Sequence, residues 1–259
     1  MATSSPSQSP TLAIATTPAT ATMPALNTTP AKRKFYEVPT VTIFVGKDQK
    51  PFYVHLDLLC NASTFFKAAF LGNFKEGSEK TMQLPEDDEE TFELFVDWLY
   101  YQRYEMLPKV EADDDDEDKG DEDDEDDETN KRYLSAFRLF VFANKYMVSH
   151  LKNLVIETLF VDLAGQTGLG PGTSPITYAY ENTTRGSGLR KLVADYHSFR
   201  IEMKWYEHPD IQALLRQQPD LSIDLNISFA KRIKGPQNYS PFNGAMPEEY
   251  KDKGSEQEK

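Results

Sequence analysis

The 259-residue chain contains a single cysteine, Cys60, and only four histidines. One cysteine excludes an internal disulfide framework and any zinc site built mainly from cysteine. The histidines, at positions 55, 150, 197 and 208, show none of the short spacings that place two imidazoles on one metal ion. We therefore expect neither a metal ion nor a cofactor.

The sequence also lacks a long apolar run. No stretch approaches the roughly 18 apolar residues that cross a bilayer. The N-terminus is rich in Ser, Thr, Ala and Pro, and it has no early basic region followed by an apolar core, so it does not resemble a signal peptide. We expect an intracellular protein, in the nucleus or the cytoplasm, with no membrane partner.

An excess of basic residues is missing too, since the formal net charge is −14. This charge is local, because residues 111–128 contain fifteen acids and one lysine, and the remainder holds 27 residues of each sign. A neutral remainder predicts no broad basic surface and no direct nucleic-acid binding. Three interpretations of the acidic run stay open: an inert insert in a surface loop, attraction of a basic partner such as a histone tail, or repulsion of nucleic acid and acidic neighbours.

The first half of the chain divides into distinct segments. Residues 1–34 are too poor in apolar residues to offset their ordering entropy, and we predict that they are disordered. The patterns that follow predict a strand hairpin within 41–55, short helices from residue 57, a strand at 81–84 and an amphipathic helix at 87–100. Asn61 and Ser63 predict a break and a cap between two short helices.

The second half is predicted to be helical after a disordered acidic insert at 111–129. Helical periodicity returns at Tyr133 and breaks near residues 147–150, and a Gly/Pro-rich loop follows at 165–175. Two or three further helices are expected within residues 176–183, 188–206 and 210–234. The polar composition of residues 234–259 predicts a loose tail.

His55 and Cys60, five residues apart, are the strongest candidates for chemistry. A Cys–His nucleophile needs contact in space and a third group that orients the base, and the pattern shows neither. Cys60 lies in an apolar helical pattern, where a lone cysteine usually behaves as a small buried hydrophobe. The stretch GLGPGTS, residues 168–174, lacks the Gly-Lys-Ser/Thr ending of a phosphate loop. We predict no enzymatic activity.

The stretch FYVHLDLLCNASTFFKAAFLGNFKEGSEKTMQLPEDDEETFELFVDWLYYQRY, residues 52–104, resembles a BTB/POZ domain. FVFANKYMVSHLKNLV, residues 140–155, extends the resemblance beyond the acidic run, and YENTTRGSGLRKLVADY, residues 180–196, looks like the BTB proteins of filamentous fungi. The resemblance implies an α+β fold, a small mixed β-sheet capped by a helical cluster over residues 35–160, with a C-terminal helical extension over 161–233. The positions that match the structural signature are His55, Leu59, Ser63, Phe66, Trp98 and Tyr100.

BTB domains bind proteins, so the resemblance implies a protein–protein interaction module in which His55 and Cys60 are structural. Many members recruit a cullin-RING ubiquitin ligase scaffold through an apolar-x-Glu motif, which Phe74 and Glu76 match here. The alternative for these two residues is that Phe74 closes the core and Glu76 is solvated. The first functional hypothesis is therefore a substrate adaptor for such a ligase, with an unknown substrate. The second is a BTB scaffold in chromatin or transcription regulation that binds basic partners through its acidic run.

The resemblance leaves the oligomeric state open. Family dimers often use an Asp before the first strand and exchange an N-terminal strand and helix. Here that position is Thr40, and the preceding residues are rich in Pro and Thr. We expect no exchanged dimer, whereas a homodimer through a helix face and a monomer both stay open.

Overall fold

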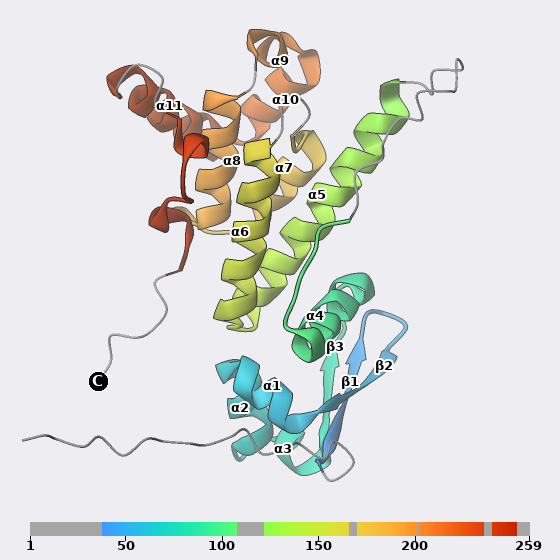
Figure 1. The fold of residues 1–259 in the computed structure, drawn as a ribbon. Coiled ribbons are helices and arrows are strands. Elements are labelled where there is room, and N and C mark those ends of the chain that lie inside the picture. Colours follow the sequence, from blue (N-terminus) through green and yellow to red (C-terminus); the bar gives the residue numbers. More distant parts are fainter. Residues whose placement is uncertain (1–37, 108–121, 166–169, 201, 236–239, 253–259) are drawn as a thin grey trace, which may run out of the picture. The chain divides into compact units, whose positions relative to one another are not determined.

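The computed structural model describes residues 38–107, 122–165, 170–200, 202–235 and 240–252 (Figure 1). Residues 1–34, predicted to be disordered, and residues 111–121 of the acidic run lie outside these ranges. Within the ranges, no helix has both the length and the apolar character that a membrane crossing needs.

A three-stranded mixed sheet opens the described chain. Its strands are β1 (Thr40–Val45), β2 (Lys50–His55) and β3 (Thr81–Leu84). The central strand, β1, pairs antiparallel with β2 and parallel with β3. Alternate residues Val41, Ile43 and Val45 of β1 are buried, which is the period of a strand with one face on the core. In β3, Met82 and Leu84 are buried beside them, as the sequence predicted.

Four helices accompany the sheet: α1 (Leu56–Ala62), α2 (Thr64–Leu71), α3 (Lys75–Glu79) and α4 (Glu89–Tyr101). The hydroxyl of Ser63 accepts a hydrogen bond from the Phe66 amide at the start of α2, which confirms the predicted cap. Asp88 caps α4 in the same way. The apolar face of α4 buries Phe92, Phe95 and Leu99, so this helix follows its predicted periodicity.

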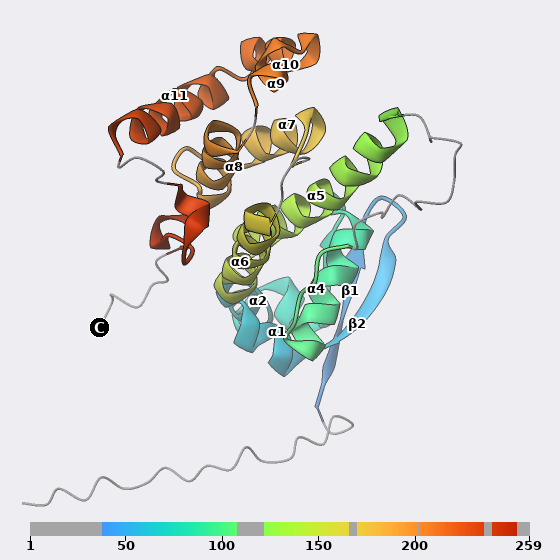
Figure 2. The same ribbon diagram turned by 45° about the horizontal axis from the view of Figure 1, so that its top comes forward.

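Two longer helices, α5 (Glu122–Lys145) and α6 (Ser149–Gly165), lie side by side in both views (Figures 1 and 2). The turn between them contains Met147, whose φ of 54° lies in the left-handed region. The C-terminal part of α5 packs against the first half of the chain through aromatic rings. Phe142 lies 5.1 Å from Phe95, and Tyr146 lies 5.3 Å from Phe66, between ring centroids.

The acidic run differs from the prediction at its C-terminal end. We expected residues 111–129 to be a disordered insert, but residues 122–129 form the first two turns of α5. Acidic residues suit the first turn of a helix, because its unpaired amides carry partial positive charge. The apolar periodicity that begins at Tyr133 then continues the same helix, and composition alone did not reveal this extension.

The C-terminal region contains five helices among the described residues. They are α7 (Thr173–Asn182), α8 (Gly188–Phe199), α9 (Met203–Glu207), α10 (Pro209–Gln217) and α11 (Pro219–Lys234). The expectation of two or three helices was therefore too low. The helix expected at 210–234 is divided because Pro219 cannot continue a helix from the preceding turn but fits the first position of a new one. The predicted domain boundary at residue 160 falls inside α6.

The predicted loose tail is wrong for residues 240–252, which we call the C-terminal segment. It forms two short 3-10 turns, Pro241–Asn243 and Glu248–Tyr250. Phe242 and Tyr250 are 5% and 2% exposed. Polar composition predicted solvation, but two buried aromatic side chains are enough to fix a short segment when complementary partners surround it.

Helix α8 is buried along most of its length and contains one buried histidine. Nδ1 of His197 lies 2.8 Å from the carbonyl oxygen of Val193, and Nε2 lies 3.1 Å from that of Pro171. Burial lowers the pKa of His197 to about 4, although both carbonyl oxygens favour the charged ring. His197 is therefore neutral in the folded protein at pH 7.

Acid is expected to destabilise the fold through His197. Between pH 6.5 and about 4 the unfolded chain binds a proton at this histidine that the folded chain does not bind, so stability falls as the pH drops through that window. The loss reaches up to about 3 kcal/mol. Urea unfolding of the wild type and of a His197→Asn variant at several pH values measures it as a difference in slope.

The exposed His208 supplies the control for this effect. A His208→Gln variant should keep the wild-type dependence on pH, whereas His197→Asn should flatten it between pH 6.5 and 4. Equal slopes in all three proteins would contradict the assignment.

Candidate functional site

The predicted partner-binding motif lies at the junction of α2 and α3. Gly72 ends α2, and its amide donates to the carbonyl oxygen of Ala68. A Cβ at position 72 would overlap that same oxygen, so a glycine is needed for this close turn. Phe74 is the N-cap residue of α3, and its carbonyl oxygen accepts from the Gly77 amide at 3.1 Å. Backbone bonds thus fix the position of Phe74 on both sides.

The side chain of Phe74 is exposed rather than buried. Phe74 is 61% exposed, and Leu71, three residues earlier, is 59% exposed. Phe74 therefore does not close the core, which was the alternative for this residue. Glu76 is half-buried in the first turn of α3, where its charge suits the helix dipole. An exposed aromatic ring and an acidic residue thus lie together at one helix start.

The signature residue His55 is bound by Tyr100. The amide of His55 donates to the Tyr100 hydroxyl at 3.3 Å, and Nδ1 of His55 lies 2.6 Å from the same oxygen. Which of the two atoms donates in the second contact depends on the tautomer of the histidine. This pair links the end of β2 to the C-terminal turn of α4, so both residues have a structural role.

Cys60 is poorly suited to act as a nucleophile. Burial raises the pKa of its thiol, and this effect outweighs the opposing charges of Lys67 and Lys80. A cysteine nucleophile reacts as the thiolate, which a raised pKa disfavours. Within the described ranges, His, Cys, Asp and Glu side chains form no group of three or more that could hold a metal ion.

The other signature residues belong to the core. Leu59 and Phe66 are fully buried, and Ser63, besides capping α2, donates to the carbonyl oxygen of Tyr146 at 2.5 Å. Trp98 is 2% exposed and stacks on Phe95 with 6.2 Å between ring centroids. Its Nε1 atom is buried without a hydrogen-bond partner in the part of the chain that the structure describes. These residues lie in or beside α1, α2 and α4 and do not belong to the exposed surface at α3.

Sequence reasoning missed two polar clusters that connect distant segments. Asp87, before α4, accepts from the Tyr146 hydroxyl at 2.5 Å and from Lys145 at 2.9 Å. Asp162 of α6 accepts two bonds from Arg132, at 2.6 and 2.9 Å, and one from the Tyr133 hydroxyl. Each carboxylate meets partners tens of residues away, and single residues of these types carry no pattern that identifies the pairing.

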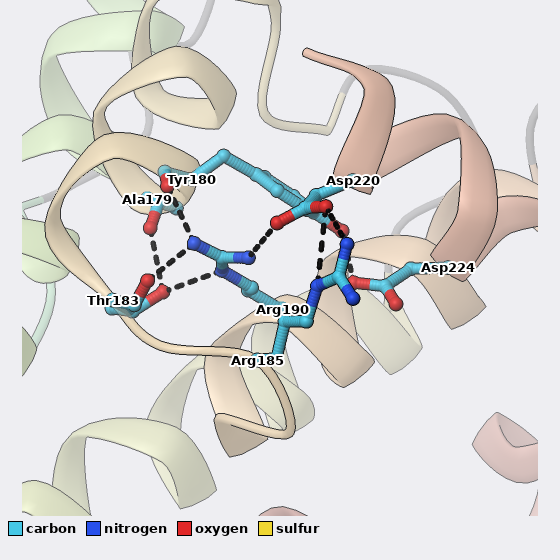
Figure 3. Close-up of polar contacts among 7 residues, drawn as sticks. All are labelled: Ala179, Tyr180, Thr183, Arg185, Arg190, Asp220 and Asp224. Atoms are coloured by element: carbon cyan, nitrogen blue, oxygen red, sulfur yellow. Dashed lines mark hydrogen bonds and ion pairs between the residues drawn. The ribbon is translucent and has the colours of Figure 1, made fainter.

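A third polar network organises residues 180–196, the segment singled out in the sequence (Figure 3). Arg190 of α8 is 5% exposed and points its guanidinium at the C-terminal end of α7. It donates to the Tyr180 carbonyl oxygen at 2.5 Å, to the carbonyl and hydroxyl oxygens of Thr183, and to Asp220 of α11 at 3.2 Å. One buried side chain therefore connects three helices.

Arg185 approaches the same carboxylate from the solvent side. It donates to Oδ1 of Asp220 at 2.5 Å, whereas Arg190 donates to Oδ2 (Figure 3). The hydrogen bond from Arg185, together with that from Arg190, lowers the pKa of Asp220. The side chain of Arg185 is 74% exposed, and that of Arg190 is 6% exposed.

These two arginines are expected to differ sharply in their effect on stability. Arg190→Ala leaves two carbonyl groups and a carboxylate without a buried donor, and should lower the free energy of unfolding by about 3 kcal/mol or more. Arg185→Ala removes a solvent-screened pair and should leave stability close to that of the wild type. Urea unfolding of both variants tests this, and similar losses would contradict the structural role given to Arg190.

In a comparison with known protein families, residues 31–116 match the family model of the BTB/POZ domain. No curated protein matches the chain significantly. The match and the small mixed sheet with its helices confirm the expected fold class, an α+β BTB/POZ fold with a helical extension. BTB/POZ domains are protein–protein interaction modules.

Proposed function

We propose that the protein is a substrate adaptor that recruits a cullin-RING ubiquitin ligase scaffold. The proposal starts from a BTB/POZ interaction module with an exposed aromatic residue at the start of α3. The observation that carries the proposal is the 61% exposure of Phe74. Phe74 and Glu76 match the apolar-x-Glu motif through which cullin-recruiting BTB domains bind. Phe74 enters an apolar pocket of the scaffold, and Glu76 lies at the rim of the contact.

The physical chemistry of this surface supports such an anchor. Burying a phenylalanine side chain contributes about 1.5–3 kcal/mol, and a single well-packed aromatic residue often dominates a small interface. Because the backbone of Phe74 is fixed by the turn at Gly72 and by the first turn of α3, little backbone conformational entropy is lost on binding. Leu71 extends the exposed apolar surface on the α2 side.

Further features of the function stay predictions. The likeness to proteins of filamentous fungi and a location in the nucleus or cytoplasm come from the sequence alone. The second hypothesis, a chromatin or transcription scaffold that binds basic partners, relies on an acidic run of which residues 111–121 lie outside the described ranges.

The proposal predicts that Phe74→Ala weakens binding to the N-terminal domain of a BTB-recruiting cullin about 30-fold or more, because a central aromatic anchor contributes roughly 2 kcal/mol or more. The full chain is expected to bind with a micromolar or tighter Kd. Titration calorimetry measures the affinity, and circular dichroism checks that the variant stays folded. Glu76→Gln should weaken binding in the same direction by a smaller factor.

Tyr53→Ala is the matched control. Tyr53 is also an exposed aromatic residue, at 70%, but it lies on the edge strand β2. Loss of affinity in both aromatic variants would assign the effect to general surface apolarity. No binding by the intact chain would overturn the adaptor proposal, and titration with a basic histone-tail peptide would then test the second hypothesis.

A further inference from the structure

The C-terminal segment, residues 240–252, is bound to α6, α8 and α11 mainly through its side chains. It follows α11 after residues 236–239, which lie outside the described ranges. In the first view it lies beside α8 (Figure 1). Apart from its own two 3-10 turns, it adopts no helix or strand. The segment therefore resembles a bound peptide, because buried aromatic side chains and ion pairs hold it against the helices.

Two aromatic side chains anchor the segment. The ring of Phe242 stacks on that of Phe160 of α6, with 5.4 Å between centroids and 15° between planes. Tyr250 buries its ring 6.1 Å from the same Phe160 and donates its hydroxyl to Oδ2 of Asp195 at 2.6 Å. The other oxygen of Asp195 accepts from Ser228 of α11 at 2.5 Å. Asp195 is 4% exposed, so this carboxylate selects a hydroxyl-bearing ring.

Charges on either side of Tyr250 meet opposite charges on the helices. Glu249 lies 3.3 Å from Lys231 of α11, and Lys251 lies 2.5 Å from Glu157 of α6. Asp252 pairs with Lys152, whose pKa burial lowers. Each residue in the order acidic, tyrosine, basic, acidic thus has a complementary partner on the helices.

The helices also bind the backbone of the segment. The side-chain amide of Asn153 accepts from the Asp252 amide at 3.1 Å and donates to the Asp252 carbonyl oxygen at 3.5 Å. Lys191 donates to the Glu249 carbonyl oxygen at 3.3 Å. A Cβ on Gly188 would overlap the Tyr250 carbonyl oxygen, so a glycine there makes room for the chain. Side chains that bind backbone groups hold a peptide segment independently of its own side chains, whereas the aromatic and charged contacts give specificity.

We propose that this face of α6, α8 and α11 is a peptide-binding site, which the C-terminal segment occupies within the chain and which a partner segment of the same chemistry enters in its place. That partner segment carries an aromatic residue, six intervening residues, and then Glu-Tyr-basic-acidic. Two observations define this partner segment: the charges on the helices are complementary to those of the C-terminal segment, and that segment is itself bound there. The site is separate from α3 and does not depend on cullin binding.

The experiment uses the full chain with residues 236–239 replaced by a protease recognition sequence. The protein is cleaved after purification and titrated with a fluorescein-labelled peptide of residues 240–252, with anisotropy as the readout. Saturable binding is expected after cleavage and little before it, because a tethered segment competes at an effective concentration of roughly millimolar order.

Two peptide variants test the contacts. The Tyr250→Phe peptide should bind about tenfold more weakly, because Oδ2 of the buried Asp195 then loses the hydrogen bond from the tyrosine hydroxyl. The Glu248→Gln peptide is the matched control and should bind as the parent does. Glu248 is 83% exposed and pairs with Lys251 of its own segment. Gly188→Ala in the cleaved chain should abolish binding of the parent peptide.

Three outcomes would overturn the proposal. Retention of the cleaved segment against a large excess of peptide, even when the protein is warmed towards its unfolding transition, would make it an inseparable part of the fold. Unfolding of the C-terminal helices on cleavage, measured by circular dichroism, would lead to the same conclusion. A stable dimer of the uncleaved chain with exchanged segments would identify a second copy, not a partner, as the occupant. A full-chain Tyr250→Ala variant that stays folded and binds the parent peptide without cleavage would support the proposal independently.

Discussion

The packing of Tyr146 against the first half of the chain is the contact on which the BTB/POZ fold depends here. Its ring stacks on Phe66, its carbonyl oxygen accepts from Ser63, and its hydroxyl donates to Asp87. These three contacts join α2, the loop before α4 and the end of α5, although the acidic run separates the first two from the third in sequence. The apolar face of α4 is covered only when α5 is in place, since Phe95 packs on Phe142. The two halves are therefore one cooperative unit, whatever the length of the connection between them.

Much of the fold could be predicted because its signals are local. Alternation in β1, the cap at Ser63 and the apolar face of α4 each follow from a few neighbouring residues. The errors occurred where a distant partner decides the structure. The C-terminal segment looks solvated until Phe160 and Asp195 are placed beside it. The start of α5 was misplaced because acidic composition was taken as evidence against a helix, whereas a helix start accommodates acids well.

The candidate site was predicted in part for the same reason. The motif at Phe74 and Glu76 is a short pattern, and a sequence cannot distinguish an exposed phenylalanine from one that closes a core. Exposure follows from the turn at Gly72, which places Phe74 at the start of α3 rather than on the buried face of α2. The roles of Arg190 and Asp195 could not be predicted, because pairing between buried charges depends on how helices far apart in sequence come together.

The close contact between Gly188 and the backbone of Tyr250 constrains the residue at the start of α8. At the first residue of a helix, an alanine normally loses less backbone entropy on folding than a glycine does. Here the carbonyl oxygen of Tyr250 occupies the volume that any other side chain would need. Because the obstacle is a main-chain oxygen, the constraint on position 188 comes from the presence of the C-terminal segment and not from the side chain at position 250. A chain without this segment would accept alanine at position 188, so the occupied face, and not the helix itself, requires the glycine there.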